Sequence, residues 1–83
     1  VVTMKSLSFD PKVVEVKKGE SVEWTNKSYT DHSATSDESG KFDTGLVAPQ
    51  KNSKAVVYSV PGTYLYHCSV HGKTMSGRVV VSP

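Results

Sequence analysis

Hydrophobic residues recur at every second position in several short segments of this chain, and no segment follows a helical repeat for any length. Alternation of this kind places apolar side chains on one face of a strand and polar side chains on the other. The alternating sets are Val14 and Val16; Val22 and Trp24; Val56, Tyr58 and Val60; Tyr64, Tyr66 and Cys68; and Val79 and Val81. The pattern predicts short strands whose inward faces bury Trp24, Tyr58, Tyr64 and Tyr66, and buried hydroxyl and indole N–H groups are expected to have hydrogen-bond partners.

Turn residues separate these segments. Lys18-Gly19-Glu20 follows the first segment, and Pro61-Gly62 comes directly before the strand that contains Tyr64. Ser, Thr, Asp and Gly crowd residues 26–49, where we expect loops, one short strand over His32–Ser36 and room for one helical turn. Many short strands between turns predict an all-β fold, either a sandwich or a barrel.

The composition narrows the class of protein. A length of 83 residues predicts a single domain over residues 1–83, small enough that a bound metal ion would help to stabilise it. Cys68 is the only cysteine, so no disulfide forms within the chain. A net charge of +2 without a dense basic stripe argues against nucleic-acid binding. No segment has the apolar length of a transmembrane helix.

A cluster of metal-binding residue types lies near the end of the chain. Cys68 is followed by His71 and then by Met75, and His32 lies far upstream. A thiolate, two imidazoles and a weak axial thioether are the ligands of blue-copper electron-transfer sites. Structural zinc sites usually have more than one cysteine, and iron–sulfur clusters need several. The pattern therefore favours one copper ion held by His32, Cys68, His71 and Met75.

The predicted strands suit this site. Cys68 ends a strand on its inward face, and we expect His71 and Met75 on the following loop, with the next strand beginning near Gly77. One loop would then supply three ligands at one end of the fold, and His32 would arrive from another strand. Alternation places His67 on the outer face, so we do not expect it to be a ligand.

Several segments resemble the cupredoxin family, of the plastocyanin and amicyanin kind. They occur in the order of the family and cover nearly the whole chain: Phe9-Asp10-Pro11, Val22-Glu23-Trp24-Thr25-Asn26, Asp31-His32-Ser33-Ala34-Thr35-Ser36, Phe42-Asp43-Thr44-Gly45, Pro61-Gly62-Thr63-Tyr64, and the loop from Cys68 to Met75. The resemblance implies a Greek-key β-sandwich or barrel of the cupredoxin type. It also implies single-electron transfer rather than enzymatic catalysis, and a location outside the cytoplasm.

The chain departs from the family at three positions. Three residues separate His71 from Met75, where the family often has two or four. Ser33 follows the upstream histidine in place of the usual Asn, and Gly72 replaces the usual Pro, which makes the loop more mobile. These changes leave open an alternative: a copper storage, sensing or delivery protein with an open axial position.

Other interpretations use the same residues differently. Cys68 could be an inert core cysteine or one member of a nucleophilic pair with a histidine, but no oxyanion-hole element accompanies it. A β-domain that binds no metal is a third possibility. For the copper protein, we expect a monomer that docks redox partner proteins near His71. Its docking patch would consist of Val47, Ala48, Pro49, Val70 and Gly72.

Overall fold

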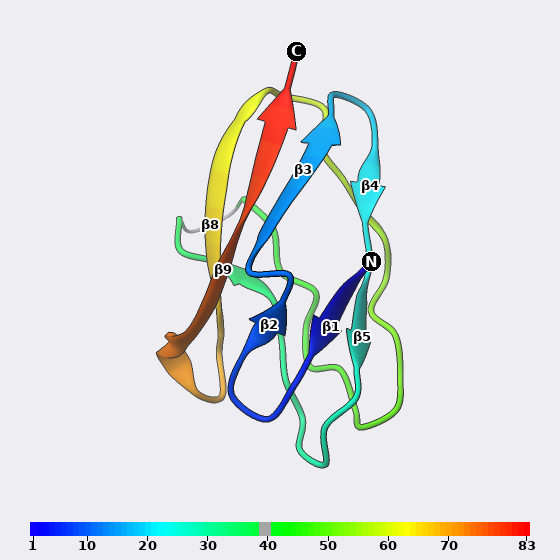
Figure 1. Cartoon of the computed structure of the whole chain (residues 1–83), viewed down its shortest axis with the longest axis vertical. Helices are drawn as coiled ribbons and strands as arrows, with labels where there is room; N and C mark the ends of the chain where they lie inside the picture. Colours follow the sequence, from blue (N-terminus) through cyan, green and yellow to red (C-terminus); the bar gives the residue numbers. More distant parts are fainter. Residues whose placement is uncertain (39–40) are drawn as a thin grey trace.

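The two longest strands of the chain form one antiparallel hairpin, β8 (Gly62–Cys68) and β9 (Gly72–Ser82). In the computed structural model, residues 1–38 and 41–83 are described, Lys73 by its backbone alone. The hairpin forms the centre of a four-stranded sheet in the order β3-β9-β8-β6 (Figure 1). Its other members are β3 (Val13–Lys17), parallel to β9, and β6 (Thr35–Ser36), antiparallel to β8.

Two smaller sheets complete the fold. The first, in the order β2-β1-β5, consists of β1 (Val2–Met4), β2 (Phe9–Asp10) and β5 (Trp24–Asn26). The second pairs β4 (Ser21–Val22) with β7 (Val56–Val57). All regular elements of the described residues are strands, which confirms the all-β prediction. The described residues accordingly contain no helix long and apolar enough to span a membrane.

The core lies on the inward faces of the predicted strands. Trp24, Tyr58, Tyr66 and Cys68 are buried as expected, and Tyr64 is half-buried against them. Ring contacts link these side chains, with Tyr66 edge-on to Trp24 at a centroid distance of 5.4 Å. Aromatic packing therefore extends along β8 toward the end of the fold that contains Cys68.

Several predicted elements are shorter or divided. The strand expected over His32–Ser36 is regular only at β6, and His32 itself forms a single bridge with Val47. The Val56–Val60 strand stops at Val57, and the helical turn expected within residues 26–49 is not found in the part of that segment that is described. Short strands at sheet edges are typical of small β-domains, because they leave little unpaired backbone exposed.

The predicted start of the last strand was wrong. It was expected near Gly77, but β9 begins at Gly72. Pairing passes from His67–Ser76 directly to Cys68–Gly72, so residues 73–75 are looped out of the ladder as a bulge. Met75 thus lies within a strand rather than on a free loop, and its side chain is fully buried.

Gly77 lies where β9 crosses the core side chain of Tyr66. A Cβ atom at this position would lie 2.7 Å from Tyr66 Oη, 2.8 Å from Tyr66 Cζ and 2.9 Å from the carbonyl oxygen of Lys12. Gly77→Ala is therefore expected to lower the free energy of unfolding by about 2 kcal/mol, because the ring and the backbone both have to move. Denaturant melts would measure the loss. Ser76→Ala, on the outer face, is the control and should stay within about 0.5 kcal/mol of the parent protein.

The buried aromatic polar groups differ from the expectation. Tyr64 Oη donates to the carbonyl oxygen of Val60 at 2.6 Å, but Trp24 Nε1, Tyr58 Oη and Tyr66 Oη have no hydrogen-bond partner among the described residues. Burial raises the pKa of Tyr58, and the neighbouring Tyr66 and Tyr64 raise it further. Burial also raises the pKa of Tyr66 to about 12, although the nearby indole N–H of Trp24, which does not meet the geometry of a hydrogen bond, lowers it slightly. The core keeps these hydroxyls protonated.

Alkaline pH is expected to destabilise the fold through these two tyrosines. The unfolded chain releases their protons near pH 10.0, whereas the folded chain still binds them, so the free energy of unfolding falls as pH rises above 10.0. The slope should reach about 1.4 kcal/mol per pH unit for each tyrosine. Denaturant melts at steps of about one pH unit, from about pH 9 to about pH 11, would measure this slope. Tyr66→Phe should reduce the slope, whereas Tyr29→Phe, at an exposed site, should not change it.

Candidate metal centre

Three potential ligand atoms converge at one end of the sandwich. Cys68 Sγ lies 3.5 Å from His32 Nδ1 and 3.6 Å from His71 Nδ1, and all three atoms lie within 4.8 Å of one another. Cys68 ends β8, His71 lies in the β8–β9 turn, and His32 comes from the segment before β6. The structure therefore brings together residues that are 36 positions apart in the sequence.

These distances fit a single metal ion. Metal–sulfur bonds of about 2.3 Å and metal–nitrogen bonds of about 2.0–2.1 Å, at angles of about 110–120°, place sulfur about 3.5–3.8 Å from each nitrogen. Both sulfur–nitrogen distances in the protein fall within that range. One thiolate with two imidazoles is a donor set that suits copper in both oxidation states. The residues present therefore fit one copper ion.

Backbone pairing fixes His32. Its N–H donates to the carbonyl oxygen of Val47 at 3.2 Å, and the Val47 N–H donates back to its carbonyl oxygen at 2.6 Å. The His32 side chain is fully buried. Burial lowers the pKa of His32, the neighbouring His71 lowers it further, and Asp31 opposes them. The ring is thus held neutral, which is the form that binds a metal ion.

Ser33 connects the two segments that carry the ligands. Its hydroxyl accepts from the backbone N–H of Ser69 at 2.9 Å and donates to Ser69 Oγ at 2.8 Å. Ser33 directly follows His32 and Ser69 directly follows Cys68. The hydrogen bonds between the two serines therefore link the backbone beside both candidate ligands. Ser33 is buried and lies 2.9 Å from Thr35 Oγ1 as well, which limits its freedom to rotate away.

Asn26 forms a second connection, which the sequence analysis did not identify. Its Nδ2 donates to the carbonyl oxygens of Thr30 and Val47, both at 2.8 Å. Its Oδ1 accepts from the N–H of Ser28 at 2.9 Å and from Ser28 Oγ at 2.7 Å. Thr30 precedes His32 by two residues, and Val47 pairs with His32 through the backbone. The fully buried amide of Asn26 therefore joins the backbone just before His32 to the segment that pairs with it.

His67 occupies the opposite face of β8, as predicted. Its Nδ1 lies 2.6 Å from Asp37 Oδ1, and both side chains are about one quarter exposed, at 21% and 24%. The carboxylate partner was not predicted, because it comes from the turn after β6, 30 residues away. The contact holds β6 against β8 on the outer side of the sheet.

The expected docking patch needs one correction. Val47 is buried, because its backbone pairs with His32 and its side chain points into the core. Its neighbour Leu46 is exposed instead, at 63%, and Val70 is exposed at 52%. Val70, next to His71 in the chain, therefore remains an exposed apolar residue, and Leu46 rather than Val47 is exposed in the segment that pairs with His32.

The comparisons with known proteins agree with one another on the family. The model of the cupredoxin-like domain family matches residues 1–81. Plastocyanin of Synechococcus sp. (strain JA-2-3B'a(2-13)) is 30% identical over 92% of this chain and 65% of its own length. Chloroplastic plastocyanin of Tetradesmus obliquus is 33% identical over 92% of this chain and 59% of its own length. The chain thus spans less than two thirds of either relative.

Solved structures share the fold. A reduced tryptophan-to-tyrosine mutant of amicyanin aligns with a TM-score of 0.87 over 98% of this chain and 79% of its own, at 22% identity. A copper-containing nitrite reductase from Thermus scotoductus SA-01 aligns with a TM-score of 0.81 over 99% of this chain but only 22% of its own, at 29% identity. The same fold therefore occurs as a domain of a longer copper enzyme.

Proposed function

Because the chain belongs to the cupredoxin-like family, we propose that it is a type 1 copper protein that carries single electrons between redox partners. The observation that supports this most directly is the triangle formed by His32 Nδ1, Cys68 Sγ and His71 Nδ1. A copper ion bound there would alternate between Cu(II) and Cu(I). The proposal assigns the chain no bond-making step of its own.

The protein would hold the copper with His32, Cys68 and His71. Cys68 and His32 are fully buried, so water is kept away from two of the three ligand atoms. Backbone pairing of His32 with Val47 and the Ser33–Ser69 hydrogen bonds restrain the ligands before metal binds. Restrained ligands move little when the oxidation state changes, which favours rapid electron transfer. Met75, buried on the β9 bulge, is the proposed axial ligand.

A copper titration tests the proposal. Adding Cu(II) to the purified apoprotein should produce an intense visible thiolate-to-copper absorption that saturates at one equivalent, together with a narrow hyperfine splitting in the electron paramagnetic resonance spectrum. A weak absorption with a wide splitting would indicate an ordinary copper adduct. Failure to bind copper would leave only the β-sandwich domain.

One structural feature supports copper storage or delivery as the second candidate. Gly72 has a φ of 68° at the start of the bulge that carries Met75, and Gly tolerates this conformation without strain. A flexible bulge could leave the axial position open. Slow electron self-exchange combined with rapid copper transfer to a chelator would favour delivery, whereas rapid self-exchange with copper retention would favour electron transfer.

We propose that redox partners dock on the apolar surface beside His71. Val70→Asp should slow electron transfer to such a partner by about tenfold, because a desolvated charge would replace an apolar contact. Stopped-flow kinetics would measure the rate. Val60→Asp carries the same substitution at another exposed site and should leave the rate unchanged. Equal rates for both variants and the parent protein would exclude this surface.

The cellular location, the number of domains and the oligomeric state are also proposals. A relative described as chloroplastic plastocyanin supports a location outside the cytoplasm, and cell fractionation with an antibody would test it. The shared core cluster supports a single domain over residues 1–83. We expect this domain to be a monomer, which light scattering of the copper-loaded protein would test.

A further inference from the structure

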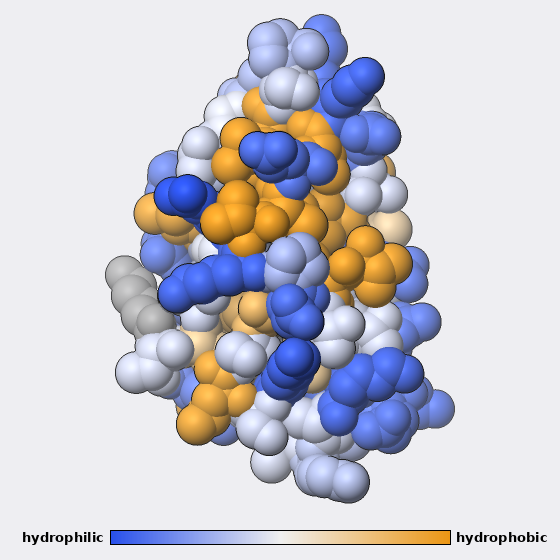
Figure 2. All heavy atoms as spheres, in the orientation of Figure 1, coloured by the Kyte–Doolittle hydropathy of each residue, from blue (hydrophilic) through white to orange (hydrophobic). Residues whose placement is uncertain are grey.

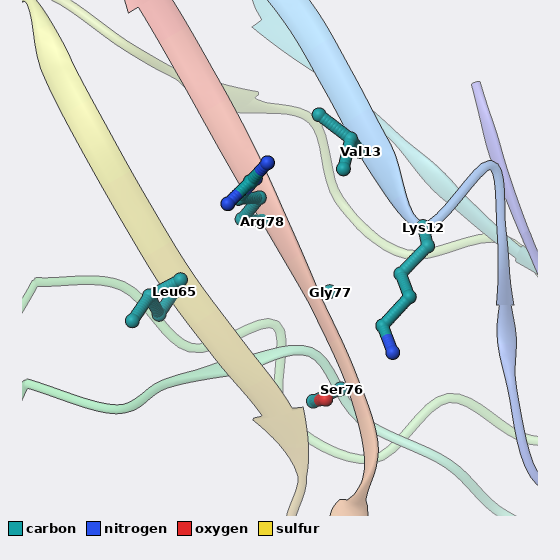
Figure 3. A pocket seen from close by; sticks show the side chains of 6 residues that line it. All are labelled: Lys12, Val13, Leu65, Ser76, Gly77 and Arg78. Atoms are coloured by element: carbon teal, nitrogen blue, oxygen red, sulfur yellow. The ribbon is translucent and has the colours of Figure 1, made fainter.

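A hollow lies on the outer face of the four-stranded sheet, away from the candidate metal centre. It encloses about 330 Å³. Its lining comes from the edge of β3 and from the middle of β8 and β9, and Figure 3 shows the residues: Lys12, Val13, Leu65, Ser76, Gly77 and Arg78. None of these residues belongs to the surface around His71. We call this hollow the sheet groove.

The sheet groove has aliphatic walls. Leu65 on β8 is 52% exposed and Val13 on β3 is 40% exposed. Ser76 and Gly77 between them add little side-chain bulk. In the orientation of Figure 1, Figure 2 shows hydrophobic side chains gathered on this face and crossed by hydrophilic ones. Exposed aliphatic residues grouped in this way favour contact with an apolar side chain of a partner.

Two cations accompany these walls. Figure 3 shows the Arg78 side chain between Leu65 and Val13, and Lys12 on the β3 side. The Arg78 backbone N–H donates to the Lys12 carbonyl oxygen at 2.9 Å, which keeps the two residues close. Among the described side chains, neither cation has a hydrogen bond or an ion pair, whereas Lys5 pairs with Asp10 at 3.3 Å. Glu15, on the same face of β3, pairs in register with Val80 and does not line the groove.

The charges and the aliphatic walls together disfavour three kinds of occupant and favour a fourth. A second copy docked through the same face would bring Lys12 and Arg78 of both copies together, and like charges in an interface are unfavourable. Nucleic acid would gain little from the aliphatic walls and needs a longer basic stripe. A small anion would leave those walls unused. Carboxylates on both sides of an apolar side chain would satisfy the cations and the walls together.

We propose that the sheet groove docks an acidic segment of a partner protein, in which carboxylates flank one apolar side chain. Arg78 and Lys12 bind the carboxylates, and Leu65 and Val13 contact the apolar side chain. The groove ends at Ser76, the register partner of His67, so the segment lies beside the strand that carries Cys68. This surface goes beyond the electron-transfer proposal and does not depend on copper.

A peptide titration tests the sheet groove on the protein as purified. The probe is a blocked peptide with one leucine between two pairs of glutamates, added in an amide NMR titration at low salt. We expect saturable shifts at Leu65, Gly77 and Arg78, and weaker binding as salt is added, because salt screens charge pairs. Arg78→Glu should weaken binding by about tenfold or more. Lys54→Glu, an exposed charge reversal outside the groove, should weaken it far less.

Three outcomes would overturn the proposal. The first is a titration without saturation. The second is equal weakening by Arg78→Glu and Lys54→Glu, which would indicate attraction to overall charge. The third is equal binding of a peptide with glutamine in place of glutamate, which would indicate purely apolar contact. Because the titration needs no metal, its result is independent of whether the copper titration succeeds.

Discussion

Cys68→Ser is expected to abolish the intense visible absorption of the copper-loaded protein. The absorption requires a copper–sulfur bond, and Cys68 is the only cysteine in the chain. Copper affinity should fall by more than about a hundredfold, since even partners that merely orient a ligand contribute tenfold to a hundredfold. The two imidazoles remain within reach of each other, with ring centroids 4.9 Å apart, so weak residual binding is expected. Optical titration against a competing chelator measures both quantities.

Two controls separate loss of the ligand from loss of the fold. Ser69→Ala, next in the chain, removes a hydroxyl but leaves all proposed ligand atoms in place, and it should retain the visible absorption. The far-ultraviolet circular dichroism of Cys68→Ser should match that of the parent apoprotein, because the hydroxyl is smaller than the thiol and overpacks nothing. An intense absorption that persists in Cys68→Ser would rule out the thiolate as a ligand.

Local sequence pattern predicted the parts of the molecule that depend on alternation. The inward positions of Trp24, Tyr66 and Cys68 follow from a period of two, and the structure confirms all three as buried. The spacing between Cys68 and His71 is short, so a single turn was enough to place them together. His32 was assigned from its residue type and from the resemblance of its surrounding segment to the family, since nothing local brings it to Cys68.

Features that depend on long-range pairing could not be predicted. The bulge at residues 73–75 arises because β8 and β9 pair on both sides of it, and no residue type within it marks that register. Val47 looked like an exposed loop residue, but its pairing with His32 turns it inward. Asn26 resembled an ordinary polar residue at the end of a strand. Three of its side-chain hydrogen bonds are made to Ser28 and Thr30 in the loop that follows, but the bond to Val47 exists only once a segment 21 residues away is folded against that loop.

Asn26→Asp is expected to destabilise the protein more than any other single change considered. The substitution keeps the size of the side chain but replaces the donating Nδ2 with an oxygen that faces the carbonyl oxygens of Thr30 and Val47. The two hydrogen bonds that Nδ2 donates are lost, and the buried carboxylate keeps only the donors of Ser28 and has no cation beside it, which costs about 3–5 kcal/mol. A domain of this size has a total stability of about 4–12 kcal/mol, so the substitution should remove at least about a quarter of it.

The same substitution should also affect the candidate metal centre, because Asn26 binds the carbonyl oxygens of Thr30, two residues before His32, and of Val47, which pairs with His32. Copper should stabilise the variant and leave it faster than it leaves the parent protein, as chelator-release kinetics would show. Asn52→Asp makes the same chemical change at an exposed site and should alter neither quantity. If Asn26→Asp lost less than about 1 kcal/mol, the amide would be a replaceable strand-end residue. If it lost stability but released copper at the parent rate, the Asn26 hydrogen bonds would support the fold without positioning His32.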